Sequence, residues 1–554
     1  MGRAPRAAAK PRASQIQSVQ PDPEPNSPPP SHGKTAVVVI HGIGEQTPLE
    51  TLRGFVETVY RRDRALASLP VGENGMLDIA IVPDDVTGSA ELRRITTLND
   101  GPQKRTDFFE FYWADIMDGT PVDMVTGWIR ALVLRSPWRL PASKKVKRAW
   151  AILAVIFAVF TIAGLMSAGF GVAQLTDGTP PDPARTDRLS YFRVWVVGLV
   201  VGGGLLWLLA NGMRAGFVMQ RVALAWPVRI VVIGLALWAI PSTLLGSFPF
   251  WAATVATLSG WALHAVVTPF AGDVVRYVRA TPSTVEQRRL VRERGLALLE
   301  ALHKKRFDDT TLETFTQAGP DNPPLYDRIV LVGHSLGTII AYDILQLFWE
   351  KYGPTHHQKW DYEDHDIQAA LRDCDAFVRA AWSDNPARPI DATQFEAARS
   401  KLFEQFRKAR PGWRISDFIT LGSPLTHAEF LLADSKEEID AACRERRFAT
   451  SPPHPDVKLD TQDTMLHLAP EADARTSKGE PARVPHFAAQ FAAVRWTNIY
   501  DEDANPFLGD LISGRLAGRF GPGIEEHPVT ISRPGRPGFL RRLFTHTQYW
   551  SWHG

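Results

Sequence analysis

Cysteine is nearly absent from this chain of 554 residues, in which only Cys374 and Cys443 occur. Two cysteines are too few for the disulfide framework that stabilises small secreted domains, and they are compatible with a reducing compartment. Neither cysteine has a partner at a spacing typical of a metal site. The sequence therefore predicts neither a structural disulfide network nor a bound metal or other cofactor.

The chain also lacks an excess of charge, because 62 Lys and Arg residues offset 60 Asp and Glu residues and leave a net charge of +2. Such a balance gives no signal for polyanion binding, so nucleic acid is not an expected partner. Residues 1–33 contain no apolar run long enough for a signal peptide and are rich in Pro, Ala and Ser. They predict a disordered arm, whose few basic residues either graze an anionic lipid surface or are simply solvated.

The strongest motif is Gly333-His-Ser-Leu-Gly337, which lies between the apolar run Arg328–Val332 and the apolar run Thr338–Tyr342. A strand, a sharp turn and a helix in this order form a nucleophile elbow, which exposes a serine hydroxyl at the top of a sheet. The flanking glycines are expected because a side chain would collide with neighbouring elements in so tight a turn. Ser335 is therefore the predicted nucleophile.

A second motif follows the first predicted strand, where Thr35–Ile40 leads directly into His41-Gly-Ile-Gly44. A turn of this HG type after an early strand supplies one amide of an oxyanion hole, and the residue after the nucleophile supplies the other. We assign these two donors to the backbone N–H groups of Ile43 and Leu336. The alternative is that His41-Gly-Ile-Gly44 is only a turn between strand and loop.

Together these motifs resemble the α/β-hydrolase superfamily, on its lipase-like side. The resemblance extends over residues from about 34 to 550 to a group of bacterial membrane-inserted hydrolases, and more distantly to the DDHD-type phospholipases. It implies an α/β fold in which helices cover a mostly parallel sheet. The other motifs that support it are Phe109-Glu-Phe-Tyr-Trp-Ala-Asp115, Leu421-Gly-Ser-Pro-Leu425, Trp496-Thr-Asn-Ile-Tyr500 and His546-Thr-Gln-Tyr-Trp550.

A serine nucleophile needs a histidine to take its proton, and in this superfamily the triad order is Ser, then Asp or Glu, then His. His546 stands near the chain end, where a lipase-like chain places its general base. The alternative for His546 is a surface histidine near a terminus. His527 lies in a sequence that predicts a turn, and His486 and His553 match none of the motifs, so these three are weaker candidates.

The triad acid is expected after the predicted strand Arg495–Tyr500, where several acidic residues follow. Asp510 is favoured because Gly509-Asp510-Leu511-Ile512 has the acid-then-apolar pattern seen after the seventh strand of similar enzymes. Asp503 is the reserve candidate. For either residue, a solvated loop carboxylate or an Asx-turn remains the alternative.

A long apolar region separates the two halves of the predicted sheet. Four runs, Trp150–Leu175, Val194–Met213, Ile230–Ser247 and Pro249–Phe270, approach or reach the length of a transmembrane helix. Strands on both sides of this region must join one sheet, so the number of crossings must be even. We predict about four crossings within residues 149–272, with a re-entrant or buried arrangement of the last two runs as the alternative.

The basic residues around these spans predict which side of the membrane carries the hydrolase domain. Basic residues precede the first span, lie between the second and third, and follow the fourth, whereas the opposite loops are balanced or uncharged. By the positive-inside rule, the hydrolase domain faces the cytoplasm, and the sequence indicates an integral protein of the bacterial inner membrane.

The hydrolase domain is thus expected in two parts, residues 34–140 and 280–554. Residues Leu77–Val82, Asp107–Trp113 and Asp417–Leu421 predict further strands, and Thr284–Lys305 predicts a charged helix. Residues from about 353 to 412 predict a largely helical insertion, which would suit a lid. Within it, Glu363-Asp-His-Asp366 carries metal-ligand residue types, but adjacent residues rarely converge on one ion, so no metal site is assigned.

The predicted activity is acyl transfer to water by a serine esterase or lipase-like enzyme, using Ser335, His546 and Asp510 with the Ile43 and Leu336 amides. The expected substrate is a carboxylic ester, with a lipid in the bilayer as the leading choice. The same residues would also suit an acyltransferase or a thioesterase. A non-catalytic membrane scaffold with a vestigial hydrolase domain is the third hypothesis. Protein partners are not indicated.

Overall fold

The computed structural model describes a central α/β domain in sixteen principal stretches, together with a few isolated residues between 147 and 282. The stretches are 34–43, 48–61, 78–84, 93–97, 105–117, 284–305, 324–353, 364–382, 392–409, 412–433, 435–455, 464–469, 475–503, 508–533, 538–542 and 545–550.

Eight strands form one mixed sheet in the order β10-β9-β6-β5-β1-β4-β3-β2. The six strands from β10 to β4 are all parallel, and β3 pairs antiparallel with both β4 and β2. A mostly parallel sheet with covering helices confirms the predicted α/β class. The strands are β1 (Lys34–Ile40), β2 (Ile79–Pro83), β3 (Arg93–Thr97), β4 (Thr106–Phe111), β5 (Tyr326–His334), β6 (Ile415–Leu421), β9 (Arg495–Asp501) and β10 (Glu525–Val529).

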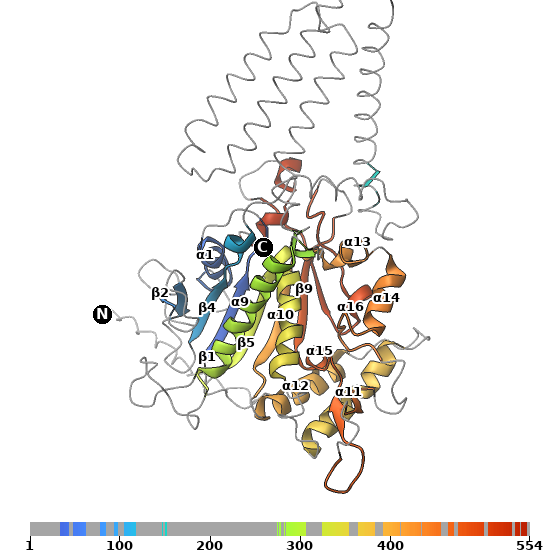
Figure 1. Ribbon diagram of the computed structural model, residues 1–554. Coiled ribbons are helices and arrows are strands. Elements are labelled where there is room, and N and C mark those ends of the chain that lie inside the picture. The colour runs from blue at the N-terminus through green and yellow to red at the C-terminus, as the bar shows by residue number, and fades with distance from the viewer. Residues whose placement is uncertain are drawn as a thin grey trace, which may run out of the picture.

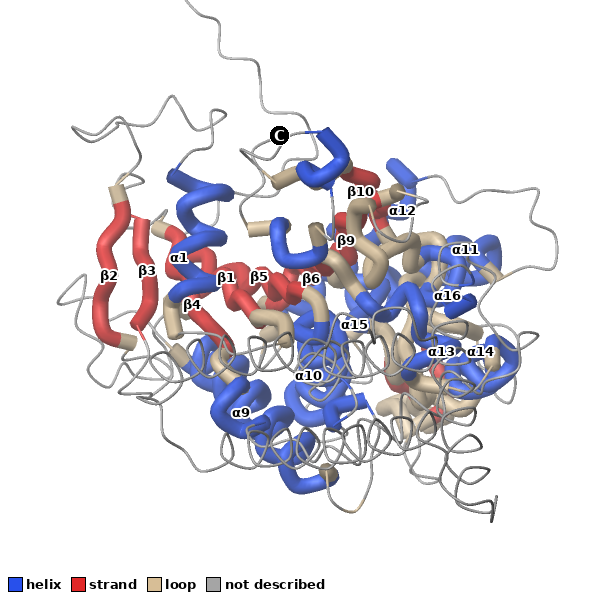
Figure 2. Tube along the Cα trace, turned by 90° about the horizontal axis from the view of Figure 1, so that it is seen from above, coloured by secondary structure: helices blue, strands red, loops and turns tan. Residues whose placement is uncertain are grey.

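Helices cover both faces of the sheet (Figures 1 and 2). Helices α9 (Val285–Lys304) and α10 (Leu336–Tyr352) lie on one face, and α1 (Glu50–Val56) lies on the other. Side chains of a strand point alternately to the two faces, and β1 follows this rule. Val38 belongs to the core under α9 and α10, whereas Val37 and Val39 belong to the core under α1. Both faces of β1 are therefore buried, which explains its unbroken apolar sequence.

Smaller elements complete the domain beyond β6. Two short helices follow β6, one directly precedes β9 and one lies between β9 and β10, and a two-stranded ribbon lies apart from the main sheet. The helices are α13 (Ala428–Leu431), α14 (Lys436–Arg444), α15 (Gln490–Ala493) and α16 (Ala517–Phe520), and the ribbon consists of β7 (Leu466–Leu468) and β8 (Arg483–Pro485).

Both halves of the chain contribute to the same sheet, as the sequence predicts. Strand β1, from the first half, pairs with β4 on one side and with β5, from the second half, on the other. The two flanks of the apolar region also meet, since the Arg276 guanidinium donates a hydrogen bond of 2.6 Å to the carbonyl oxygen of Met117. Met117 and Arg276, which flank the apolar region in the sequence, therefore lie side by side in the domain.

The predicted transmembrane insertion, residues 149–272, lies outside the described residues except at positions 150 and 151. Among the helices that the structure does describe, none combines the length and the apolar character needed to cross a bilayer. The membrane crossings therefore stay a prediction from the sequence.

The strands and helices predicted from hydrophobic pattern are confirmed within a few residues, but two edge regions differ. Strand β3 was not predicted, and the sequence around His527 predicted a turn, whereas it forms strand β10. Pro528 is tolerated there because β10 is an edge strand, with no partner on its outer side in the part of the chain that the structure describes. The side chain of His527 pairs with Glu525 at 2.9 Å and takes no part in the site described below.

The insertion between α10 and β6 is helical, as predicted, and consists of α11 (His365–Ala381) and α12 (Ala392–Lys408). Its suggested role as a lid is wrong. Helix α10 runs antiparallel to the strands and delivers the chain to their amino ends, where α12 packs Phe406 against Trp349 and leads into β6. These two helices therefore lie toward the amino ends of the strands (Figure 1), whereas Ser335 follows the carboxyl end of β5.

Candidate active site

Ser335 occupies a strained turn between β5 and α10. Its backbone has φ 53° and ψ −127°, a conformation that L residues rarely adopt and that costs about 1–3 kcal/mol. A Cβ at Gly333 would lie 2.7 Å from Cα of Thr338, and one at Gly337 would lie 2.3 Å from the carbonyl oxygen of Ile40. Only glycine therefore fits at these two positions, the first against α10 and the second against the end of β1.

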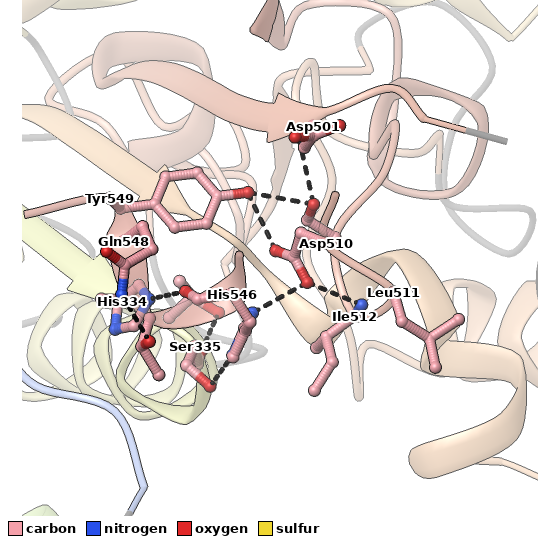
Figure 3. A network of polar contacts seen from close by, with 12 residues as sticks. His334, Ser335, Asp501, Asp510, Leu511, Ile512, His546, Gln548 and Tyr549 are labelled. Atoms are coloured by element: carbon pink, nitrogen blue, oxygen red, sulfur yellow. Dashed lines mark hydrogen bonds and ion pairs between the residues drawn. The ribbon is translucent and has the colours of Figure 1, made fainter. Parts of the chain in front are cut away.

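His546 reaches the Ser335 hydroxyl from the last described part of the chain (Figure 3). Nε2 of His546 lies 2.7 Å from Oγ of Ser335, and the hydroxyl donates to it when the ring is neutral. The histidine belongs to a single 3₁₀ turn, His546–Gln548. The two side chains are 211 positions apart in the sequence, so the fold alone brings them together.

Asp510 lies on the far side of the same imidazole. Its Oδ1 is 2.9 Å from Nδ1 of His546 and accepts the N–H of Ile512 at 2.8 Å. Burial alone would raise the pKa of Asp510, but the charge and hydrogen bond of His546 and the Ile512 amide outweigh it and hold that pKa well below the ordinary value. Asp510 is therefore an anion, placed to fix Nδ1 as a donor.

Tyr549 fixes the second oxygen of this carboxylate. Its hydroxyl donates to Oδ2 of Asp510 at 2.9 Å and also lies 3.0 Å from Oγ of Ser513. The ring packs against Gly422, where an added Cβ would come within 2.7 Å of the ring edge. Gly422 belongs to the motif Leu421–Leu425, so this motif makes room for the tyrosine that orients Asp510.

The reserve acid Asp503 does not reach the imidazole in this structure. Its Oδ2 pairs with Arg542 at 2.8 Å, and the same guanidinium contacts the buried carboxylate of Asp501 at 3.2 Å. Asp501 also accepts the backbone N–H groups of Asp503 and Ile531. These carboxylates tie the loop after β9 to the segment that carries His546.

His486, another candidate histidine, makes its contacts away from Ser335. His486 is fully buried against His467, with ring centroids 4.9 Å apart, and accepts the N–H of Ala488 at 3.0 Å. His553 lies outside the described residues. Of the histidines considered from the sequence, His546 is therefore the one that the described structure brings to the nucleophile.

The turn after β1 passes directly over the nucleophile. A Cβ at Gly42 would lie 2.8 Å from Cβ of Ser335 and 3.1 Å from Nδ1 of His334, so the backbone at Gly42 approaches as closely as the atoms allow. Ile43 follows at once, and Leu336 is the first residue of α10, where backbone N–H groups point out of the helix unpaired by its own ladder. The turn that leads into Ile43 therefore lies against the nucleophile turn, and the roles of the Ile43 and Leu336 amides as oxyanion donors stay predictions from the sequence.

Gly42→Ala tests this close approach. The new methyl group cannot fit without moving the turn, so the Ile43 amide should shift and kcat should fall by about 10²–10³-fold, the effect of losing one oxyanion donor. Turnover of a chromogenic ester and circular dichroism would report activity and folding separately. Gly518→Ala is the matched control, since nothing lies within 4 Å of its added Cβ. Turnover of Gly42→Ala equal to that of this control would contradict the assignment.

The motif Phe109–Asp115 lies beside β1 and supports the turn after β1, which contains His41 and Gly42. The Trp113 indole stacks on the His41 ring at 5.0 Å, and its N–H donates to the His41 carbonyl oxygen at 3.1 Å. Nδ1 of His41 lies 2.8 Å from the Gly42 carbonyl oxygen, and burial lowers the pKa of His41 to about 4. His41 is therefore a neutral, buried ring that holds the turn in shape.

Glu110 holds Leu49, the residue before α1. Its Oε2 accepts the N–H of Leu49 at 2.5 Å, and its Oε1 has no hydrogen-bond partner among the described residues. Burial raises the pKa of Glu110 to about 7, and the Leu49 hydrogen bond offsets only part of that effect. Keeping Glu110 ionised in the folded protein therefore costs free energy.

This cost predicts a pH-dependent effect of Glu110→Gln. The folded pKa lies above the unfolded value of about 4.3, so the contribution of Glu110 to stability is complete below pH ~4 and is lost as the pH rises to 7. Glutamine keeps an acceptor for Leu49 and has no charge to bury. The free energy of unfolding of the Gln variant minus that of the wild type should therefore increase by about 3 kcal/mol from pH 4 to pH 8. Denaturant titrations at both pH values measure this, and a difference independent of pH would refute it.

Metal-ligand residues do not gather anywhere in the described part of the chain: no group of three or more His, Cys, Asp or Glu side chains could hold an ion there. In the motif Glu363–Asp366, Asp364 caps α11 by accepting the N–H groups of Asp366 and Ile367, while Glu363 lies outside the described residues. A helix cap explains this acidic residue without a metal.

Comparison with known proteins adds no relative to this description, since no protein-family model, curated protein or solved structure matches the chain. The site must be interpreted from its own geometry. Sequence reasoning assigned no role to Tyr549, Trp113 or Glu110, although all three lie within quoted motifs. Their buried polar groups contact the site only after folding.

Proposed function

We propose that this chain is a membrane-anchored serine hydrolase with an α/β-hydrolase fold, which cleaves a carboxylic ester of a lipid. The observation that carries the proposal is the row of contacts from Asp510 through His546 to Ser335, at 2.9 Å and 2.7 Å. If Asp510 were only a solvated carboxylate, His546 a surface histidine and Ser335 a core serine, nothing would require the three side chains to contact one another in this order. The strained φ of Ser335 gives independent support, because strain of this kind collects at reactive residues.

The chemistry follows from the position of each group. Nε2 of His546 takes the proton of Ser335 as Oγ attacks the ester carbonyl carbon. The Ile43 and Leu336 N–H groups stabilise the oxyanion, each contributing about 3–4 kcal/mol to lowering the barrier. The tetrahedral intermediate collapses to an acyl-enzyme, and the leaving alkoxide receives the proton from His546. Water then attacks the acyl-enzyme with the same base, which releases the carboxylic acid and restores Ser335.

The lipid substrate is supported by the relation of the site to the apolar insertion. Strand β4 is parallel to β1 and β5, so its carboxyl end lies at the same edge of the sheet as Ser335. Met117, six residues beyond this end, accepts a hydrogen bond from Arg276, which lies four residues after the predicted insertion. If residues 149–272 cross the bilayer, the nucleophile faces the membrane surface, where acyl chains are concentrated.

Incubation of the full chain in lipid nanodiscs with a fluorophosphonate probe tests the proposal. The wild type should be labelled at Ser335, and with a total lipid extract it should release fatty acids that a Ser335→Ala variant does not release. Absence of labelling in the wild type would refute the serine hydrolase. Labelling with unchanged lipids would exclude the lipid ester and favour a soluble ester or thioester.

A further inference from the structure

The general base of the proposed reaction sits on a segment with little structure of its own. His546–Gln548 is one 3₁₀ turn, too short to fix its orientation by internal hydrogen bonds. Ties to other elements must therefore hold it. The Thr545 N–H donates to the Gly509 carbonyl oxygen at 3.0 Å, and the Thr58 hydroxyl donates to the Trp550 carbonyl oxygen at 2.6 Å. Neither bond involves the backbone of His546 itself.

His334 makes the contact to that backbone. Its Nε2 lies 2.9 Å from the carbonyl oxygen of His546 (Figure 3). A carbonyl oxygen only accepts, so Nε2 of His334 must carry the proton and donate. The His334 ring also packs against the rings of His546, Tyr549 and Trp550, with centroids 5.2, 5.5 and 5.1 Å away. His334 thus combines ring packing against this turn with a hydrogen bond to the backbone of the base itself.

The protonation state of His334 suits a permanent donor. Burial, and next the nearby His546, lower its pKa to about 3. The ring therefore stays neutral across the pH range in which a histidine base works, and its single N–H remains on Nε2. A protonated His334 ring would repel the imidazolium that forms on His546 during the reaction, whereas the neutral His334 ring does not.

We propose that His334 is a positioning residue that acts through the backbone of His546, an inference that rests on the proposed function. His334 and Ser335 are neighbours on the same rigid turn, so the elbow holds the base at two points, its side chain through Oγ and its carbonyl through His334. Movement of the base relative to the nucleophile is thereby limited. A displacement of about 1 Å between reacting groups costs on the order of 10²-fold in rate.

A pair of variants separates the hydrogen bond from the space that the ring fills. His334→Phe keeps a ring but has no donor, and His334→Gln carries an amide N–H at a reach similar to that of Nε2. For the Phe variant we expect kcat for a chromogenic ester to fall by about 10- to 100-fold at unchanged KM. The Gln variant should recover to within about threefold of the wild type, because it restores the donor. Should His334→Phe fail to accumulate, His334→Met fills the space with a flexible chain that also lacks a donor.

Fluorophosphonate labelling keeps this inference distinct from the proposed function. In the donor-less variant the final extent of labelling should equal that of the wild type, while its rate falls in parallel with kcat. The role of His334 would be refuted if the wild type and His334→Phe were labelled at equal rates, or if His334→Gln were as slow as His334→Phe. Either result would leave the proposed serine hydrolase unaffected. A rise in KM without loss of kcat would also overturn the role of His334, as it would indicate substrate contact. A wild type that takes no label refutes the proposed function itself.

Discussion

Ser335→Ala should lower the turnover of any ester substrate by on the order of 10⁶-fold, because it removes the nucleophile of the proposed acyl-enzyme. A small residual rate above water should persist, since the proposed oxyanion donors at Ile43 and Leu336 stay in place. The assay is hydrolysis of a chromogenic ester by the full chain in nanodiscs. Labelling by the fluorophosphonate probe should vanish in the same variant.

Loss of folding would imitate this result, so the structure calls for a second variant at the same position. Alanine keeps the strain at φ 53°, whereas glycine adopts that backbone freely. Ser335→Gly should therefore be inactive and yet melt at a temperature no lower than that of Ser335→Ala. A variant of either kind with turnover within tenfold of the wild type would remove Ser335 from the mechanism.

Asp510→Asn should reduce kcat by about 10⁴-fold while the protein stays folded. In the proposed mechanism the carboxylate holds Nδ1 of His546 as a donor and stabilises the imidazolium, and an amide supplies neither the charge nor the correct tautomer. The fall should appear in kcat and kcat/KM alike, because the lost interaction is made mainly in the transition state. Steady-state kinetics over a range of substrate concentrations separate the two parameters.

Asp503→Asn is the matched control, since Asp503 follows the same strand and pairs with Arg542 instead of His546. Its turnover should stay within a few-fold of the wild type. The reverse outcome, with Asp503→Asn impaired and Asp510→Asn active, would move the acid to Asp503. Similar losses in both variants would indicate that the loop after β9 matters as a unit.

The errors of sequence-based prediction have identifiable physical reasons. Strand β10 contains Glu525, His527 and Pro528, and only its register against β9 makes it a strand. The lid was misplaced although the sequence contained the necessary information. A helix of 17 residues after the elbow spans about 25 Å, which carries the chain to the amino ends of the strands before α11 begins.

The choice between Asp510 and Asp503 shows what local sequence cannot decide. Both residues follow β9 in a loop of acidic residues, and either carboxylate could be solvated. Gly509 adopts φ 71°, and its amide donates to the Arg542 carbonyl oxygen at 2.6 Å. These contacts come from the end of the chain, and they place Asp510 beside His546 while Arg542 neutralises Asp503.

The sequence by itself determined the elements whose signal is local: the apolar strands, the glycines that permit the elbow, and the choice of Ser335 and His546 as the candidates that the fold brings into contact. A tight turn or a buried strand depends on neighbours along the chain, and hydrophobic pattern reports it directly. Only the tertiary structure decided which acid meets the base and that His334 and Tyr549 hold them. Those contacts join segments up to 212 positions apart, and their geometry exists only once the sheet aligns the carboxyl ends of its strands.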